Sequence, residues 1–350
     1  MAAPSVPSAP ATTLSLKSRL AAWRYAFLTT NPPEEGVVDG VTRWLVVTRA
    51  GVLPMTLTSG LIAVLLAAIA PAGTTVDWLN VSLAVIGIVI AHLANNLMND
   101  LADTQVGNDT ENYPRALYAP HPILAGLVTK RQLVVGILIC QVLDLAIMAT
   151  LIARQSWWIA AFALGGLFLS YAYTAPPLRL KKIGLGELDV LITWGPLMVG
   201  GVYYAGTGTL TWQVLTAATV YALLPTTVLM GKHIDKLPYD QPAGTKTFPV
   251  VVGERAARVI TQAMIIAFYI GVAALVATKA LPWPALLVAL AVPRAVAAIR
   301  SFSQPKPAEA PPNNPVWPLW WAPIAFLHTR RAGGLLILGL LGWAIWLAVR

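Results

Sequence analysis

Stretches of about twenty mostly apolar residues recur along the whole chain, and this repetition constrains the fold more than any other feature. A helix of about twenty residues crosses the roughly 30 Å hydrocarbon core of a lipid bilayer. The chain of 350 residues is 57% hydrophobic and only 11% charged, so it lacks the polar residues that would cover a water-soluble fold. We therefore expect an all-α integral membrane protein with many spans.

Nine transmembrane helices are predicted from these stretches. Their ranges are 51–71, 78–99, 132–153, 156–174, 187–205, 211–231, 257–277, 281–299 and 333–349. Residues 1–45 contain no continuous apolar region of the kind that a cleaved signal needs, and we expect a cytoplasmic segment that is flexible at its start. Residues 46–350 are expected to form a single transmembrane domain, in which 310–332, rich in Pro and Trp, favours an interfacial stretch over a span.

The basic residues are distributed unevenly between the two sides of this topology. Of the 24 Lys and Arg residues, all but Arg154, Lys279 and Arg350 fall on the side of the amino terminus. This bias predicts a multi-pass protein of the inner (plasma) membrane, with its amino terminus in the cytoplasm and its carboxy terminus outside. The net charge of +9 is scattered over short connections, so we expect a lipid bilayer and no nucleic acid as partner.

Acidic and amide side chains gather at the end of the second predicted span. Asn96, Asp100 and Asp103 follow one another at helical spacings of four and three residues, and Asn99 lies four residues before Asp103. These side chains therefore share one helical face at the membrane boundary. Mg²⁺ prefers such hard oxygen ligands together with water and phosphate oxygens.

A second acidic group, Asp235 and Asp240, follows the sixth predicted span on the same side of the membrane. Two acidic helix ends that face each other would hold divalent cations around one diphosphate. The plainer alternative, that these acids are ordinary caps and loop charges, does not account for a run of amides and carboxylates on one helical face.

Three segments resemble the UbiA superfamily of intramembrane prenyltransferases. The first acidic segment is similar to its NxxxNDxxDxxxD motif, in the variant with Gly107 before Asp109, and the second acidic segment is similar to its DxxxD motif. Residues 171–187, which include Tyr-Thr-Ala-Pro-Pro-Leu-Arg-Leu and Gly-Leu-Gly-Glu, resemble a segment of the 1,4-dihydroxy-2-naphthoate polyprenyltransferases of the menaquinone branch. Two departures are the five steps between Asp235 and Asp240 and the proline between them.

The resemblance implies a nine-helix bundle with a central cavity that opens at the cytoplasmic side. It implies Mg²⁺-dependent transfer of a polyprenyl group from a polyprenyl diphosphate to an aromatic acceptor, with 1,4-dihydroxy-2-naphthoate as the acceptor of this branch. The catalytic residues would be Asp100, Asp103 and Asp235. The metal ligands would be Asn96, Asn99, Asp100, Asp103, Asp109, Asp235 and Asp240. The substrate-binding residues would be Asn95, Arg115, Lys130, Tyr173, Arg179, Lys182 and Lys232.

Several alternatives stay open. Other UbiA-type enzymes use a different acceptor, such as 4-hydroxybenzoate or homogentisate. The sequence does not distinguish among these acceptors. An ion-coupled secondary transporter also places acids in broken helices, although its acids normally lie near the membrane midplane. Asp144 lies in the middle of the third predicted span, where a hydrogen bond to a neighbouring helix or a part in acceptor binding would account for it.

Overall fold

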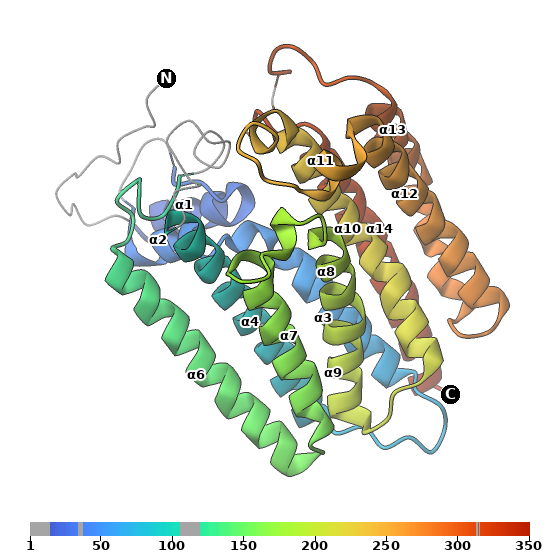
Figure 1. Ribbon diagram of the computed structural model, residues 1–350. Helices are drawn as coiled ribbons and strands as arrows, with labels where there is room; N and C mark the ends of the chain where they lie inside the picture. Colours follow the sequence, from blue (N-terminus) through green and yellow to red (C-terminus); the bar gives the residue numbers. More distant parts are fainter. Residues whose placement is uncertain (1–14, 34–37, 106–119, 313, 315) are drawn as a thin grey trace. The chain divides into compact units, whose positions relative to one another are not determined.

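The computed structural model describes residues 15–33, 38–105, 120–312, 314 and 316–350, with the side chains of 103–105 left out, and is built of helices (Figure 1). Before residue 106 the helices are α1 (Leu16–Thr29), α2 (Gly40–Val47), η1 (Ala50–Val52), α3 (Leu53–Ala68) and α4 (Trp78–Gln105). Next come α6 (Lys130–Arg154), α7 (Trp158–Thr174), η2 (Leu180–Lys182), α8 (Gly186–Ile192), η3 (Thr193–Leu197) and α9 (Met198–Thr207). The last are α10 (Trp212–Asp240), α11 (Phe248–Val252), α12 (Glu254–Ala277), η4 (Trp283–Ala291), α13 (Val292–Ser303) and α14 (Trp321–Ala348).

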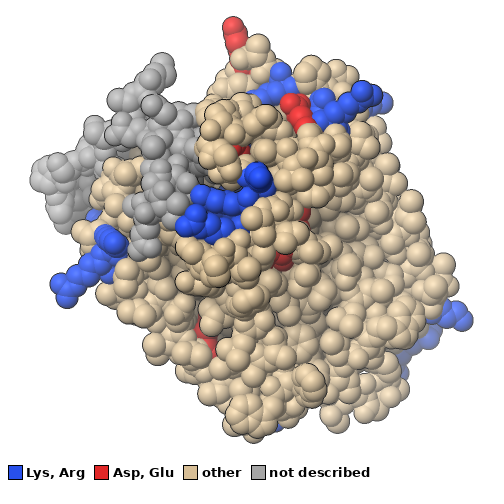
Figure 2. Space-filling view, viewed as in Figure 1, with Lys and Arg blue, Asp and Glu red and all other residues tan. Residues whose placement is uncertain are grey.

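Among the described residues, eight helical segments are long and apolar enough to cross a membrane. α7 is a further apolar helix of 17 residues, so it corresponds to the predicted span 156–174 but falls just short of that length. On the face shown in Figure 2, uncharged residues make up most of the visible surface. Side chains such as Val142 and Ile270 are more than 60% exposed, which suits contact with lipid. The predicted all-α membrane fold is confirmed.

The fifth predicted span is continuous although it contains proline. Residues Gly186–Thr207 form α8, a five-residue π-helical turn at η3 and then α9. Pro196 lies in the π turn, where the wider hydrogen-bonding pattern accommodates its missing N–H group. Gly195 lets this turn approach α10, because an added Cβ atom would lie 2.7 Å from the carbonyl oxygen of Ala218.

The final helix is longer than the sequence predicted. We expected 310–332 to be interfacial and the last span to begin at 333, but α14 begins at Trp321. The predicted start of the last helix was wrong because Arg330 and Arg331 interrupt the apolar pattern before 333. An interfacial position for 310–332 stays a prediction. Pro323 lies in the first turn of α14, where proline is tolerated because an N–H group at this position would have no partner inside the helix.

The chain divides into two compact units, and α4 and α6 contribute to both. The first comprises 1–53, 90–144 and 308–318, and its core contains Val47, Leu97 and Leu133. The second comprises 54–89, 145–307 and 319–350. Its largest core cluster joins α3, α10, α12, η4 and α14, with Tyr221 and Phe268 fully buried.

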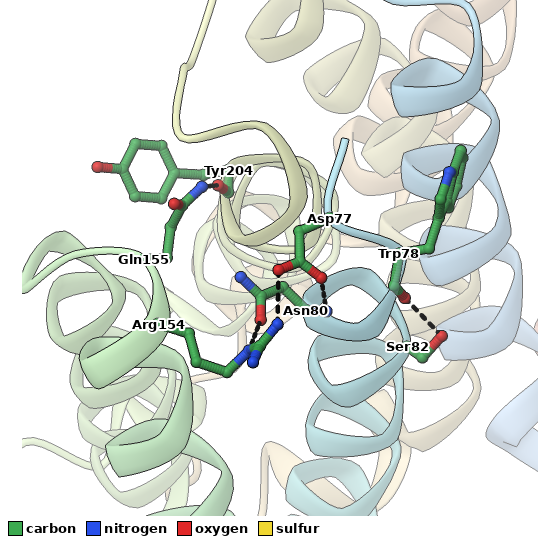
Figure 3. A network of polar contacts seen from close by, with 7 residues as sticks. All are labelled: Asp77, Trp78, Asn80, Ser82, Arg154, Gln155 and Tyr204. Carbon is green, nitrogen blue, oxygen red and sulfur yellow. Dashed lines mark hydrogen bonds and ion pairs between the residues drawn. The ribbon is translucent and has the colours of Figure 1, made fainter. Parts of the chain in front are cut away.

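A polar network holds helix ends together at the amino end of α4, far along this helix from its acidic segment (Figure 3). The Arg154 guanidinium donates to the Asn80 side-chain oxygen at 2.6 Å and to the Asp77 carboxylate at 2.7 Å. The Gln155 amide donates to the carbonyl oxygen of Tyr204 at 3.3 Å. The backbone N–H of Asn80, together with Arg154, holds the pKa of Asp77 below its ordinary value. The network therefore ties α4, α6 and α9 together within the second unit.

Candidate active site

The predicted acidic face on α4 is buried and is fastened to the segment after α2. Asp100 has a fully buried side chain and forms an ion pair and hydrogen bond with Arg49. The Asn96 amide donates to the carbonyl oxygen of Thr48 at 2.9 Å. Arg49 has a positive φ of 55°, a conformation that non-glycine residues seldom adopt. The chain therefore turns sharply here to bring a guanidinium onto a buried carboxylate.

The other residues predicted for this site divide between described and undescribed parts of the chain. Asn99 is buried and Asn95 is half-buried on α4, while Lys130 is the exposed first residue of α6. Asp103 continues the helix, but its side chain lies outside the described residues. Asp109 and Arg115 lie outside them altogether. The described part of the first motif is thus a buried face of amides and one carboxylate, paired to a cation.

Asp235 lies at the carboxyl end of α10 and accepts hydrogen bonds from the start of α14. Its two carboxylate oxygens accept from the backbone N–H groups of Trp321 and Ala322 at 3.3 and 3.0 Å. These N–H groups have no partner inside their own helix, and the positive end of the helix dipole favours an anion there. The Lys306 ammonium is 3.9 Å away. Burial lowers the pKa of Lys306, and the nearby carboxylate opposes this effect.

Asp240 has separate surroundings from Asp235, although both lie on α10. Five residues advance an α-helix by about 140° beyond a full turn, so the two carboxylates lie on different faces. Asp240 is buried and lies 3.6 Å from the Lys236 ammonium, one turn earlier. Lys232 is half-buried on the same helix. The departure from the four-residue spacing therefore separates the two acids of the second motif.

The segment that follows α7 meets the end of α10 within the second unit. The Oε1 atom of Glu187, at the start of α8, lies 2.7 Å from the Nδ1 atom of His233 on α10, and both side chains are buried. Ile183 and Lys246 form an isolated parallel β-bridge, which is the only β pairing across the described ranges. The structure thus brings the segment after α7 together with the end of α10 and the residues that follow it, which lie 46 or more positions later in the sequence.

The basic and aromatic residues predicted to bind substrate lie along this segment. Tyr173 is half-buried near the end of α7, and the Lys181 ammonium lies 6.0 Å from the centre of its ring. Arg179 has a positive φ of 49°, and its buried Nε has no hydrogen-bond partner among the described residues. Lys182 ends η2 and is half-buried.

The two acidic segments differ in the groups that their oxygens contact. The buried face of α4 presents amide and carboxylate oxygens, the donor set that Mg²⁺ takes. The oxygens of Asp235 already accept two backbone hydrogen bonds. No three His, Cys, Asp or Glu residues gather at a metal-binding distance among those whose side chains are described. The α4 face therefore has the donor types of a magnesium site, with Asp100 also paired to Arg49, and Asp235 caps α14.

Sequence reasoning missed the partners of these acids. It assigned no role in the site to Arg49 or His233, and it treated Glu187 only as part of a motif. Asp189 was not singled out, although it is buried on α8 and its Oδ1 has no hydrogen-bond partner in the described part of the chain. The signal that was available for Glu187 and Asp189 is their place at the start of an apolar span, where a charge is costly.

Comparison with known proteins decides the family. The sequence profile described as the UbiA prenyltransferase family matches residues 60–322, which is most of the chain. The chain belongs to the UbiA prenyltransferase family. The predicted family and enzyme class, a UbiA-type prenyltransferase, are thereby confirmed.

Two relatives of this UbiA prenyltransferase are named as enzymes that act on naphthoquinone or naphthoate compounds. The 2-carboxy-1,4-naphthoquinone phytyltransferase of Synechocystis is 29% identical over 60% of this chain and 66% of its own length. The 1,4-dihydroxy-2-naphthoate octaprenyltransferase of Bacillus subtilis is 28% identical over 72% of this chain and 80% of its own length. The alignment with the first relative thus spans slightly less than two thirds of that protein.

A solved structure shares the fold of this UbiA chain. A UbiA homologue from Archaeoglobus fulgidus, described as bound to GPP and Mg²⁺, superposes with a TM-score of 0.54, at 17% identity, over 84% of this chain and 99% of its own. The predicted UbiA-type bundle is confirmed at the level of fold. The central cavity and the residues that line it stay predictions.

Proposed function

We propose that this protein transfers a polyprenyl group from a polyprenyl diphosphate to 1,4-dihydroxy-2-naphthoate, using Mg²⁺. The observation that carries the proposal is the buried face of α4, where Asn96, Asn99 and Asp100 lie together at one end of a transmembrane helix. Polar and charged groups buried in a transmembrane helix cost free energy, so their presence indicates a functional site. The names of the two relatives, a naphthoquinone phytyltransferase and a dihydroxynaphthoate octaprenyltransferase, support the choice of acceptor.

The residues of α4 would hold the metal and, through it, the diphosphate. Bound Mg²⁺ supplies positive charge that stabilises the departing pyrophosphate. In the proposal, Asn96, Asn99, Asp100 and Asp103 ligate the metal, with Asp109 completing the set. Arg49 compensates the buried negative charge of Asp100 and keeps this carboxylate in place.

The remaining predicted residues would bind the substrates. Asn95, Arg115, Lys130, Arg179, Lys182 and Lys232 would hold phosphate oxygens or orient the groups that do, because guanidinium and ammonium groups pair strongly with phosphate. Tyr173 would shield the allylic cation with the face of its ring. For Asp235 and Asp240 a metal role stays a prediction, and at Asp235 it competes with the observed cap on α14.

The membrane and the orientation of the chain follow from the apolar helices and the basic residues. Its many apolar helices make it a multi-pass membrane protein. We propose the plasma membrane, a cytoplasmic amino terminus and a single functional transmembrane domain over residues 46–350, because the basic residues favour this orientation.

The test is turnover by purified protein with Mg²⁺, a polyprenyl diphosphate and a panel of aromatic acceptors, followed by product mass. Asp100→Asn and Asp103→Asn should each lower kcat by about 100-fold or more, since each removes charge that the metal site needs. Asp77→Asn, at the other end of α4, is the control and should leave turnover unchanged. Undiminished turnover in both site variants would overturn the metal assignment. Product from another acceptor alone would move the protein to another branch, and ion flux without product would favour a transporter.

A further inference from the structure

A pocket of about 640 Å³ lies on the second unit between η4, α13 and α14. It is lined by Leu290, Pro293, Arg294, Ala297, Leu327, Arg330 and Arg331. Leu290 and Leu327 are 62% and 48% exposed, so the apolar part of the pocket faces outward from the helices. None of these residues belongs to the acidic segments or to the segment after α7. The pocket therefore shares no lining residue with the proposed active site.

Three arginines line this pocket, and none of them has an acidic partner in the described part of the chain. Arg294, Arg330 and Arg331 take part in none of the ion pairs recorded among the described residues. Arg330 lies over the ring of Phe326, with its guanidinium carbon 5.7 Å from the ring centre. Three cations on helices that span a membrane repel one another and need an anion to compensate them.

The lengths of the helices place these cations near one surface of the bilayer. Arg331 lies 17 residues before the end of α14 at Ala348, which corresponds to about 26 Å of helix. Arg294 lies near the start of α13, after the nine-residue 3-10 helix η4, which gives about 22 Å from the far end of that span. Both distances approach the roughly 30 Å hydrocarbon thickness. The helix positions of these arginines thus lie within about 10 Å of the membrane boundary near the start of α14, and their long side chains can extend from there to the headgroups.

The chemistry of the lining fits one kind of ligand. Guanidinium groups bind phosphate oxygens in a bidentate manner, and basic pockets between transmembrane helices bind the headgroups of anionic lipids. The exposed leucines continue the pocket toward the hydrocarbon, where acyl chains would contact them. A free inorganic anion would leave this apolar part uncovered.

We propose that the pocket between α13 and α14 binds the phosphate headgroup of an anionic phospholipid from the surrounding membrane. The three arginines hold the phosphate, while Leu290 and Leu327 contact the first part of the acyl chains. The lipid would join two helices that otherwise repel each other across the pocket.

Native mass spectrometry of the full-length protein, delipidated in detergent and titrated with phosphatidylglycerol or phosphatidylcholine, tests this. We expect the unaltered protein to bind phosphatidylglycerol more tightly than phosphatidylcholine. The ratio of the two affinities should fall about fivefold in each of Arg294→Gln, Arg330→Gln and Arg331→Gln. The matched control is Arg300→Gln, an exposed arginine on the same helix as Arg294 that does not line the pocket. Its affinity for phosphatidylglycerol should match that of the unaltered protein.

Three outcomes would overturn the proposal. The first is unchanged phosphatidylglycerol binding in all three single variants. The second is an equal loss in Arg300→Gln, which would indicate diffuse attraction by the basic side of the protein. The third is displacement of phosphatidylglycerol by equimolar pyrophosphate or farnesyl diphosphate, which would make the site one for diphosphates. The triple Arg→Lys variant, which keeps the charge, should retain a preference for phosphatidylglycerol over phosphatidylcholine.

Discussion

Asp235 illustrates how a motif residue acquires its role from its neighbours. In the sequence it is the first acid of a metal-binding pattern, whereas in the structure its oxygens accept the free N–H groups at the start of α14. Asp100, by contrast, lies on α4 beside Arg49 and two buried amides. The two aspartates are the same residue type, and they differ in the groups that donate hydrogen bonds to them.

The cap on α14 predicts the effect of changing Asp235. Asp235→Asn should lower the free energy of unfolding by about 1–3 kcal/mol, because it weakens two buried hydrogen bonds to a charged acceptor. Thermal unfolding in detergent would measure the change. Lys306→Met is the matched variant and should cost about 1 kcal/mol or less, because the ammonium is 3.9 Å away and partly exposed. If Asp235→Asn abolished turnover and left stability unaltered, a metal role would replace the cap.

The surroundings of Asp39 make the stability of α1 and α2 depend on pH. Burial would raise the pKa of Asp39, but the Thr42 N–H and Trp23 indole, which donate at 2.7 and 2.8 Å, and the nearby Arg19 outweigh this and lower it. The folded pKa is therefore below the unfolded value of 3.8, so the stabilisation is complete above that value and is lost as the pH falls through the folded pKa.

Hydrogen exchange in α1 and α2, corrected for intrinsic rates, should thus rise as the pH falls below about 4. Asp39→Asn keeps a side chain that caps helices well but does not titrate, so its corrected exchange should be independent of pH in this range. The same pH dependence in that variant would assign the effect to another group.

At the scale of elements, α10 and α14 pack at very short range. An added Cβ atom at Gly231 would lie 2.8 Å from the backbone nitrogen of Ala322. The same contact places the end of α10 where Asp235 reaches the first N–H groups of α14. Close packing and capping therefore depend on one another at this crossing.

Gly231→Ala should force the two helices apart and lower the free energy of unfolding by about 1–3 kcal/mol. Gly334→Ala is the matched control on α14, because nothing lies within 4 Å of its added Cβ atom. Alanine forms helix better than glycine, so this control should stabilise the protein by up to about 1 kcal/mol. Thermal midpoints of the two variants would give the comparison, and an equal loss in both would contradict the packing explanation.

At the scale of the whole molecule, α7 decides the topology. With α7 as a crossing, this helix and the eight longer spans found among the described residues make an odd number, which puts the two ends of the chain on opposite sides of the membrane. Without it, the termini lie on the same side. The distribution of Lys and Arg favours the odd number.

Labelling with a membrane-impermeant thiol reagent would decide between these topologies. Cys140 is the only cysteine in the chain, so Cys140→Ala provides a background without thiols. In intact cells Arg350→Cys should react, while Lys181→Cys, after α7, should react only once the membrane is permeabilised. Reaction of Lys181→Cys in intact cells would show that α7 does not cross.

The sequence by itself determined the membrane class, most span positions and the family, because apolar length and the spacing of Asn99, Asp100 and neighbouring acids are local properties of the chain. It did not predict the early start of α14, because Arg330 and Arg331 interrupt the apolar pattern and the cap on the first N–H groups comes from Asp235 of another helix. It also could not pair Asp100 with Arg49 or Glu187 with His233. Only the tertiary structure decided these partners, because the free energy of a buried charge depends on donors that packing brings from distant segments.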